Sequence, residues 1–84
     1  MILCWHEKAW SQYLYWQDTN KKTAKNINKL IKEIMREPFT GIGKPEPLKH
    51  QWQGWWSRRI DSVNRLVYKV DGDNILIAQC RFHY

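Results

Sequence analysis

Residues 65–84 read RLVYKVDGDNILIAQCRFHY, and the rest of the predicted fold is arranged around this stretch. Aliphatic residues and a tyrosine flank DGDN, whose glycine and acidic residues favour a tight turn. The pattern predicts a β-hairpin with strands at about 65–70 and 75–82. Residues 81–84 follow the second strand without a linker, so a cation, an imidazole and a phenol are held at the end of a packed strand.

The register of this hairpin decides which side chains share a face of the sheet. A two-residue loop, Gly72-Asp73, would put Arg65 on the face of Cys80. A three-residue loop that adds Asn74 is also allowed, because asparagine tolerates the left-handed backbone region. The longer loop separates apolar from polar side chains better, and we predict it. On this register the apolar face carries Leu66, Tyr68, Val70, Leu76, Ala78 and Cys80. The opposite face carries Arg65, Val67, Lys69, Ile77, Gln79, Arg81 and His83.

Two amphipathic helices precede the hairpin. Apolar residues at helical spacing predict the first helix between residue 7 and about residue 17. The second helix ends before Pro38, because the residue before a proline is pushed out of the α region. The polar residues 18–20 can end the first helix and cap the second. The apolar stripe of the second helix consists of Ala24, Ile27, Leu30, Ile31, Ile34 and Met35. The lysines beside this stripe form either a solvated surface or a contact for RNA backbone or an acidic partner.

A short strand at 2–5 and another at about 56–61 complete the predicted elements. Each helix has one apolar face, so both are expected to cover the apolar face of the sheet. The fold class is therefore α+β, with two N-terminal helices packed on one face of a mainly antiparallel sheet of about four strands. A length of 84 residues predicts one domain, 1–84. The breaker-rich segment 38–54 is predicted to be a long loop across the open face.

Composition narrows the class of protein. The sequence holds no apolar run of about 18 residues that could span a membrane and no basic leader, so a cytoplasmic location is expected. The net charge of +6 favours a polyanionic partner, either nucleic acid or an acidic protein. Cys4 and Cys80 are too few for a disulfide framework and are predicted to be buried, reduced thiols. A zinc site that adds His6 and His83 is disfavoured, because Cys80 and His83 would point to opposite faces of one strand.

The cationic face gathers groups that suit metal-free cleavage of RNA. The strands are expected to bring Arg59, Arg65, Arg81 and His83 to it, and the loop to bring Glu46, Lys49 and His50. In such a cleavage a base takes the proton of the 2′-hydroxyl, an acid protonates the leaving 5′-oxygen, and a cation stabilises the charged phosphorane. Glu46, His83 and Arg65 fit these three roles in that order, with His50 as a supporting residue.

The same residues also have ordinary explanations. A glutamate in a proline-rich loop is usually solvated, a penultimate histidine is often disordered, and arginines on a strand edge discourage aggregation. Trp52, Trp55 and Trp56 are either core material or platforms for stacked bases. The competing function is a non-catalytic basic module that holds RNA, DNA or an acidic peptide. A glutamate facing a histidine among cations favours the enzyme.

Four motifs match a known family along the whole chain. They are GKPEPLKH at 43–50, WSRRI at 56–60, RLVY at 65–68 and CRFHY at 80–84. Through them the chain closely resembles the YoeB toxins, within the RelE-like superfamily of bacterial type II toxin–antitoxin systems. The resemblance implies a microbial-ribonuclease-like fold and a ribosome-dependent endoribonuclease that cuts mRNA in the decoding site and so inhibits translation. It implies no metal or organic cofactor.

Residue roles and partners follow from the same resemblance. The family's general base falls on Glu46, its general acid on His83 and its phosphate-stabilising arginine on Arg65. Supporting positions fall on Lys49, Arg59 and Tyr84. The implied partner is a YefM-like antitoxin whose acidic segment would cover the cleft, and operator DNA would be bound only through that pair. YoeB-like toxins are also associated with homodimers. Val63 stands where relatives often carry an acidic residue, so no role is carried over there.

Overall fold

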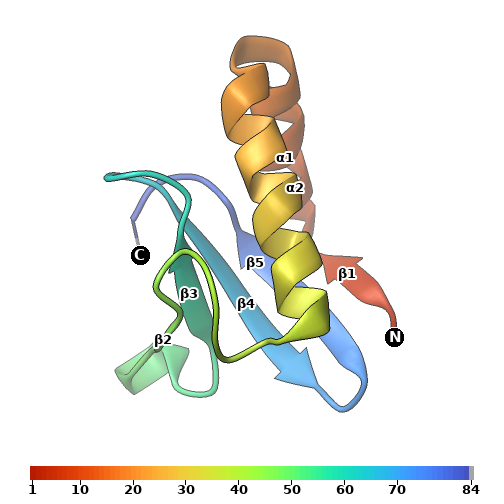
Figure 1. Cartoon of the computed structure of the whole chain (residues 1–84), viewed down its shortest axis with the longest axis vertical. Helices are drawn as coiled ribbons and strands as arrows, with labels where there is room; N and C mark the ends of the chain where they lie inside the picture. Colours follow the sequence, from red (N-terminus) through yellow and green to blue (C-terminus); the bar gives the residue numbers. More distant parts are fainter. Residues whose placement is uncertain (84) are drawn as a thin grey trace.

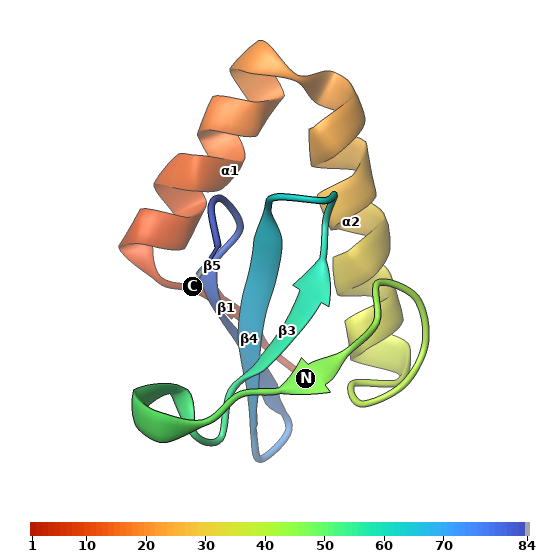
Figure 2. The same ribbon diagram turned by 90° about the vertical axis from the view of Figure 1, so that its left-hand side faces the viewer.

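The computed structural model describes residues 1–83 of the chain. Within that range two helices lie on one face of a mixed sheet whose strand order is β1-β5-β4-β3-β2 (Figures 1 and 2). β1 runs parallel to β5, and the other neighbouring strands are antiparallel. The elements are β1 (Leu3–Trp5), α1 (Glu7–Thr19), α2 (Lys21–Arg36), β2 (Glu46–Pro47), the 3-10 turn η1 (His50–Trp52), β3 (Trp56–Arg59), β4 (Arg65–Asp71) and β5 (Asn74–Gln79). The predicted α+β class is confirmed.

The two helices are separated by a single residue, Asn20, which serves both. Its backbone N–H donates to the carbonyl of Trp16 at 2.8 Å and so closes the last turn of α1. Its side-chain Oδ1 accepts the N–H of Thr23 at 3.2 Å and so caps the first turn of α2. The predicted cap is therefore confirmed. At the other end α2 stops one residue before Glu37, which precedes the proline, as predicted.

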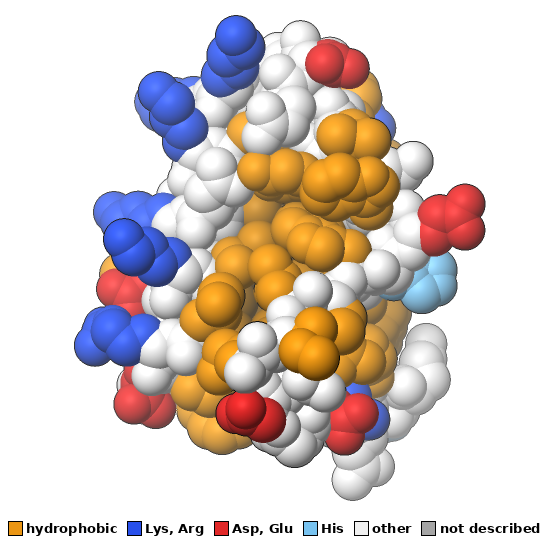
Figure 3. Space-filling view, turned by 90° about the vertical axis from the view of Figure 1, so that its right-hand side faces the viewer, with side chains coloured by type: hydrophobic (Ala, Val, Ile, Leu, Met, Phe, Trp, Pro, Cys, Tyr) orange, Lys and Arg blue, Asp and Glu red, His pale blue; other side chains and the backbone are white. Residues whose placement is uncertain are grey.

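The helices bury their apolar stripe against the sheet. The core holds Ala9, Ile27, Leu30, Ile31, Ile34, Ile60, Leu66, Tyr68, Ile75, Ile77 and Cys80. Met35, which the stripe also predicted, is instead exposed and lines a groove beside β1. Hydrophobic side chains gather on the molecular face that Figure 3 shows. The stripe is wider than the sheet can cover, so its edge remains at the surface.

The predicted register of the last hairpin is wrong at the turn. Asp71 pairs with Asn74, which leaves a two-residue loop in which Gly72 has a φ of +60°. Ile75 and Ile77 therefore face the helices in place of Leu76 and Ala78, which are half-buried on the other face.

A β-bulge then restores the predicted arrangement at the far end of the hairpin. Tyr68 pairs with Ile77 but Val67 pairs with Gln79, so Ala78 has no partner opposite it. The extra residue reverses the alternation, and Cys80 enters the core. The prediction assumed one unbroken register, whereas the bulge allows a tight turn and a continuous apolar face together.

Two further boundaries differ from the prediction. β2 lies inside the segment predicted to be a loop, because two residues suffice to pair with β3 and leave no alternation to detect. β5 ends at Gln79 rather than at residue 82. In residues 1–83 no helix combines the length and apolar character needed to cross a membrane.

The two cysteines differ in environment, and the prediction that both are buried holds only for Cys80. Cys4 is exposed. The Sγ of Cys80 lies 3.5 Å from the carbonyl oxygen of Ala9, and burial raises the pKa of this thiol to about 12. A thiol must be deprotonated to react as a nucleophile, so Cys80 should be inert in the folded protein.

We therefore expect iodoacetamide at pH 8 to alkylate the native protein once, at Cys4. Intact-protein mass spectrometry would count the adducts, and a second adduct should appear only after unfolding in denaturant. Native Cys4→Ser protein should take no label. Equal labelling rates for the two thiols in native protein would contradict the buried position of Cys80.

Candidate active site

Sheet pairing places Glu46 on the face away from the helices. Glu46 is opposite Ser57, and Ser57 is opposite Val67. Residues directly opposite each other in an antiparallel pair point to the same side of the sheet. Ser57 and Val67 alternate with residues that face the core, so this row projects from the other side, which we call the distal face. Its centre is covered, since Val67 is fully buried, while Glu46 is exposed.

The next row of the distal face carries two arginines. Arg59 is directly opposite Arg65, so the prediction that the two arginines share a face is confirmed. Each is two residues from a member of the first row, so both project from the same face as Glu46. Like charges placed opposite each other destabilise a sheet. The Asp61 carboxylate beside Arg65 offsets part of this repulsion, and an anionic ligand on the row would offset more of it.

The loop around Glu46 forms a shallow hollow of about 420 Å³ lined by residues 46–52. Lys49 and His50 both line it, so the structure brings these two predicted residues beside Glu46. The buried Leu48 anchors the loop, and its N–H donates to the carbonyl of Trp55 at 2.9 Å. Trp52 and Trp55 contact each other edge to face, with ring centroids 5.8 Å apart, and are half-buried.

The guanidinium of Arg65 is fixed by the loop that precedes it. Its Nη1 donates to the carbonyls of Asp61 at 2.9 Å and Asn64 at 3.1 Å. Partial burial raises the pKa of the Asp61 carboxyl, but hydrogen bonds from Asn64 and Val63 and the charge of Arg65 outweigh it, so that pKa is lowered overall. Asp61 therefore stays ionised beside Arg65 across the physiological range.

His83 follows directly on a peptide that is bonded to Arg65. The backbone N–H of Arg65 donates to the carbonyl of Phe82 at 3.0 Å, and Phe82 has a φ of +68°. The exposed His83 thus directly follows a residue that is hydrogen-bonded to the first residue of β4. Tyr84, the remaining predicted supporting residue, lies outside the described residues.

Arg81 does not join the distal face, which corrects the prediction. Its Cζ lies 3.7 Å from the ring centroid of Tyr15 in α1. The difference arises because β5 ends at Gln79 and the chain turns there. The backbone of Cys80 is held by α1: its N–H donates to Gln12 Oε1 and its carbonyl accepts from Trp16 Nε1, both at 2.8 Å.

Comparisons with known proteins show the family and the fold of the chain. Residues 5–84 match the family of the YoeB-like toxin of bacterial type II toxin-antitoxin system. The toxin YoeB of Escherichia coli K12 is 58% identical over the full length of both chains. A YoeB/ParE toxin from Agrobacterium tumefaciens is 46% identical and has a TM-score of 0.98 over both whole chains. The chain belongs to the YoeB-like toxins.

Two structures from Staphylococcus aureus extend the comparison to assemblies. A chain of the YoeB-YefM complex is 46% identical, with a TM-score of 0.93 over all of this chain and 98% of that one. A YoeB dimer from the same organism is 45% identical, with the same TM-score and coverage. Membership of the YoeB-like family makes this chain the toxin component of a type II toxin–antitoxin system.

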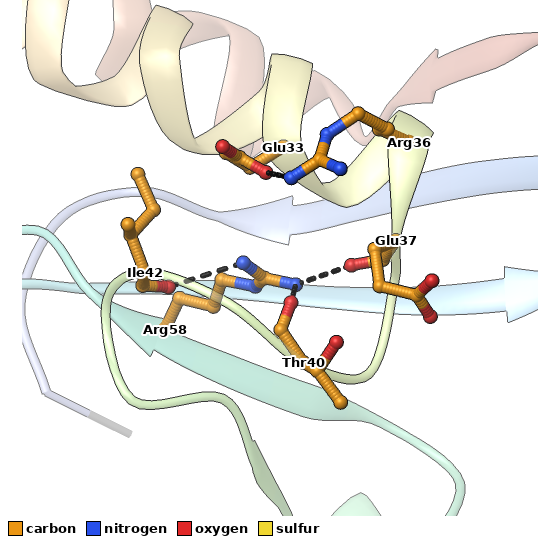
Figure 4. Close-up of polar contacts among 6 residues, drawn as sticks. All are labelled: Glu33, Arg36, Glu37, Thr40, Ile42 and Arg58. Carbon is orange, nitrogen blue, oxygen red and sulfur yellow. Dashed lines mark hydrogen bonds and ion pairs between the residues drawn. The ribbon is translucent and has the colours of Figure 1, made fainter.

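One residue that supports the site was not predicted. Arg58 is fully buried, and its guanidinium donates to the carbonyls of Glu37 at 2.7 Å, Thr40 at 2.8 Å and Ile42 at 3.0 Å (Figure 4). Its Nε donates to the hydroxyl of Tyr68 at 3.2 Å. Strand alternation was the available signal, because it places Arg58 on the apolar face while Arg59 lies on the distal face.

Arg58 therefore secures the start of the segment that carries the candidate site in this YoeB-like toxin. The backbone continues from Ile42 to Gly43, whose carbonyl accepts the N–H of Arg59 at 2.7 Å. A Cβ at Gly43 would lie 2.8 Å from Leu30 Cδ2, so only glycine allows this close approach to α2. Three residues later the chain reaches Glu46. The position of that carboxylate thus depends on a buried cation and a glycine.

We expect Arg58→Met to lower the free energy of unfolding by about 3 kcal/mol or more, because it leaves several buried acceptors without donors. Arg59→Met is the matched control, since it removes the same charge from the next residue on the exposed side. Its effect should be within about 0.5 kcal/mol. Urea unfolding followed by tryptophan fluorescence measures both, and equal losses would show that burial of Arg58 contributes nothing.

Proposed function

We propose that this YoeB-like toxin is a ribosome-dependent endoribonuclease that cuts mRNA in the decoding site and thereby inhibits translation. The observation that carries the proposal is the shared distal face. Sheet register brings Glu46, Arg59 and Arg65 to one side, and His83 follows a peptide bonded to Arg65. A carboxylate, two guanidinium groups and an imidazole are the groups that phosphodiester cleavage by acid and base requires.

In the proposed reaction the chain's own side chains move both protons. The Glu46 carboxylate takes the proton of the 2′-hydroxyl, and O2′ attacks the adjacent phosphorus. His83, in its protonated form, donates a proton to O5′ as the P–O5′ bond breaks. The products are a 2′,3′-cyclic phosphate and a free 5′-hydroxyl. No step uses a metal or an organic cofactor.

The cationic groups have separate tasks in this proposal. Arg65 faces the phosphorane and stabilises its added negative charge, and its two bonds to loop carbonyls orient it for that role. Arg59 and Lys49 bind the flanking phosphates, and His50 lines the hollow beside Glu46. Tyr84 is proposed as a further supporting contact.

A site of this kind explains a need for the ribosome. The base is on the two-residue strand β2, the arginines are on β3 and β4, and the acid is on the terminal tail, so the catalytic groups come from separate segments of the chain. The ribosome would supply an mRNA held in one conformation and complete the alignment, which lowers the entropic cost of the reaction. We therefore propose that free RNA is a poor substrate.

The assembly partners are proposed from the relatives. The S. aureus complex pairs YoeB with YefM, and we propose a YefM-like antitoxin for this chain, with an acidic segment over the distal face. The negative charges of such a segment would offset the repulsion between Arg59 and Arg65. Operator DNA would be bound only through the antitoxin complex. We also propose a homodimer, as in the S. aureus YoeB dimer, and a cytoplasmic location.

Cleavage is tested by mapping the 5′ ends of mRNA on translating ribosomes. Glu46→Gln and His83→Ala should each reduce cleavage by about 100-fold or more, the usual contribution of a general acid or base. Glu7→Gln, which removes an exposed carboxylate from α1, should cut like wild type. Equal cleavage by wild type and His83→Ala would remove His83 from the mechanism. Absence of cleavage by wild type would instead indicate a non-catalytic binding module.

A further inference from the structure

Asn64 joins the β3–β4 loop to the C-terminal tail. Its Oδ1 accepts the backbone N–H of Phe82 at 2.7 Å. Its Nδ2 donates to the Asp61 carboxylate, with the shorter distance, 3.0 Å, to Oδ2. The backbone N–H of Asn64 donates to Asp61 Oδ1 at 2.6 Å. Asp61 therefore holds both the backbone and the side chain of Asn64. The Oδ1 of Asn64 is left to accept the hydrogen bond from the C-terminal tail.

Both backbone polar groups of Phe82 are consequently hydrogen-bonded. Its N–H is bound by the Asn64 side chain, and its carbonyl by the backbone N–H of Arg65. Gln79 adds a weaker contact from Nε2 to the same carbonyl at 3.4 Å. Figure 1 shows the loop after β3 and the end of the chain meeting at one edge of the molecule.

The backbone of Phe82 needs such support. A φ of +68° is unfavourable for a bulky residue and persists only where the surroundings impose it. Core packing does not impose it, because the Phe82 side chain is 54% exposed. The Phe82 ring also contacts Arg81, whose Cζ lies 4.5 Å from the ring centroid.

We propose that Asn64 is the positioning residue that aims His83 at the scissile phosphate. The proposal rests on the proposed function, in which His83 protonates the leaving oxygen. The same residue supports Arg65, because the Asn64 carbonyl accepts from Arg65 Nη1. One loop residue therefore ties the proton donor to the phosphate-binding cation. Loss of the side-chain bond frees the N–H of Phe82 and lets His83 shift, and a shift of about 1 Å can cost about 100-fold in rate.

The test compares two leaving groups in mRNA bound to programmed ribosomes. One mRNA has the natural linkage, and the other has sulfur in place of O5′ at the scissile bond. A thiolate leaves without a proton, since an alkyl thiol has a pKa of about 8.5, so the sulfur substrate does not need the acid. Single-turnover cleavage is measured for wild type, His83→Ala, Asn64→Ala and Asn20→Ala. Asn20→Ala removes the cap of α2 and controls for lost stability away from the site.

We expect Asn64→Ala to cut the natural mRNA at least about tenfold more slowly than wild type, and the sulfur mRNA within about threefold of it. His83→Ala should show the same pattern with a larger loss. Asn20→Ala should lower the melting temperature and cleave both mRNAs at the wild-type rate.

A double substitution tests the geometry by rescue. Asp61→Asn with Asn64→Asp keeps an amide paired with a carboxylate, keeps an oxygen acceptor for the N–H of Phe82, and leaves the net charge unchanged. It should restore natural mRNA cleavage to within about threefold of wild type.

The outcomes separate two kinds of failure. If His83→Ala recovers on the sulfur mRNA but Asn64→Ala does not, Asn64 does not act through His83 and the positioning role is overturned. Failure of the double substitution to exceed Asn64→Ala would overturn it as well. If His83→Ala is equally slow on both mRNAs, the assignment of His83 as the acid fails, and the role of Asn64 fails with it.

Discussion

The candidate site depends on the hydrogen bonds that the buried guanidinium of Arg58 donates. A charge inside a protein is tolerated only when its hydrogen-bonding groups find partners. Here the partners are backbone carbonyls of residues 37–42 and the hydroxyl of Tyr68, which itself donates to the carbonyl of Pro38 at 2.6 Å. The segment leaving α2 is therefore bound to the middle of the sheet. The loop that carries Glu46 starts from a fixed point although it has little regular structure of its own.

One face of the sheet favours folding, and the other opposes it. The helix side buries nearly all the aliphatic residues of the core, and its hydrophobic burial is the main favourable term in folding. The distal face places Arg59 opposite Arg65, and like charges in this arrangement oppose folding, an effect that the Asp61 carboxylate beside Arg65 offsets only from one side. Such a compromise between stability and function is common at ligand sites. It also explains why an acidic antitoxin segment and an RNA backbone are compatible with the same surface.

The features that depend on a few neighbouring residues could be predicted from the sequence. The cap at Asn20, the end of α2 before Pro38 and the shared face of Arg59 and Arg65 were all predicted. The turn at residues 71–74 was not, because the β-bulge opposite Val67 and Tyr68 shifts the alternation midway along the hairpin. Arg81 was placed on the wrong face for a related reason, since the strand was expected to continue to residue 82. The burial of Arg58 was not predicted, because burial depends on neighbours distant in the sequence.

By itself the sequence determined the fold class, the order of most elements and the types of residue that meet on the cationic face, because amphipathic period, caps and turn residues act over a few positions. How the tail and the loops are held depends on tertiary contacts. The bonds from Asn64 to Phe82 and from Arg58 to the loop carbonyls join segments up to 21 residues apart along the chain. They form only after the sheet has brought those segments together, and no local pattern records them.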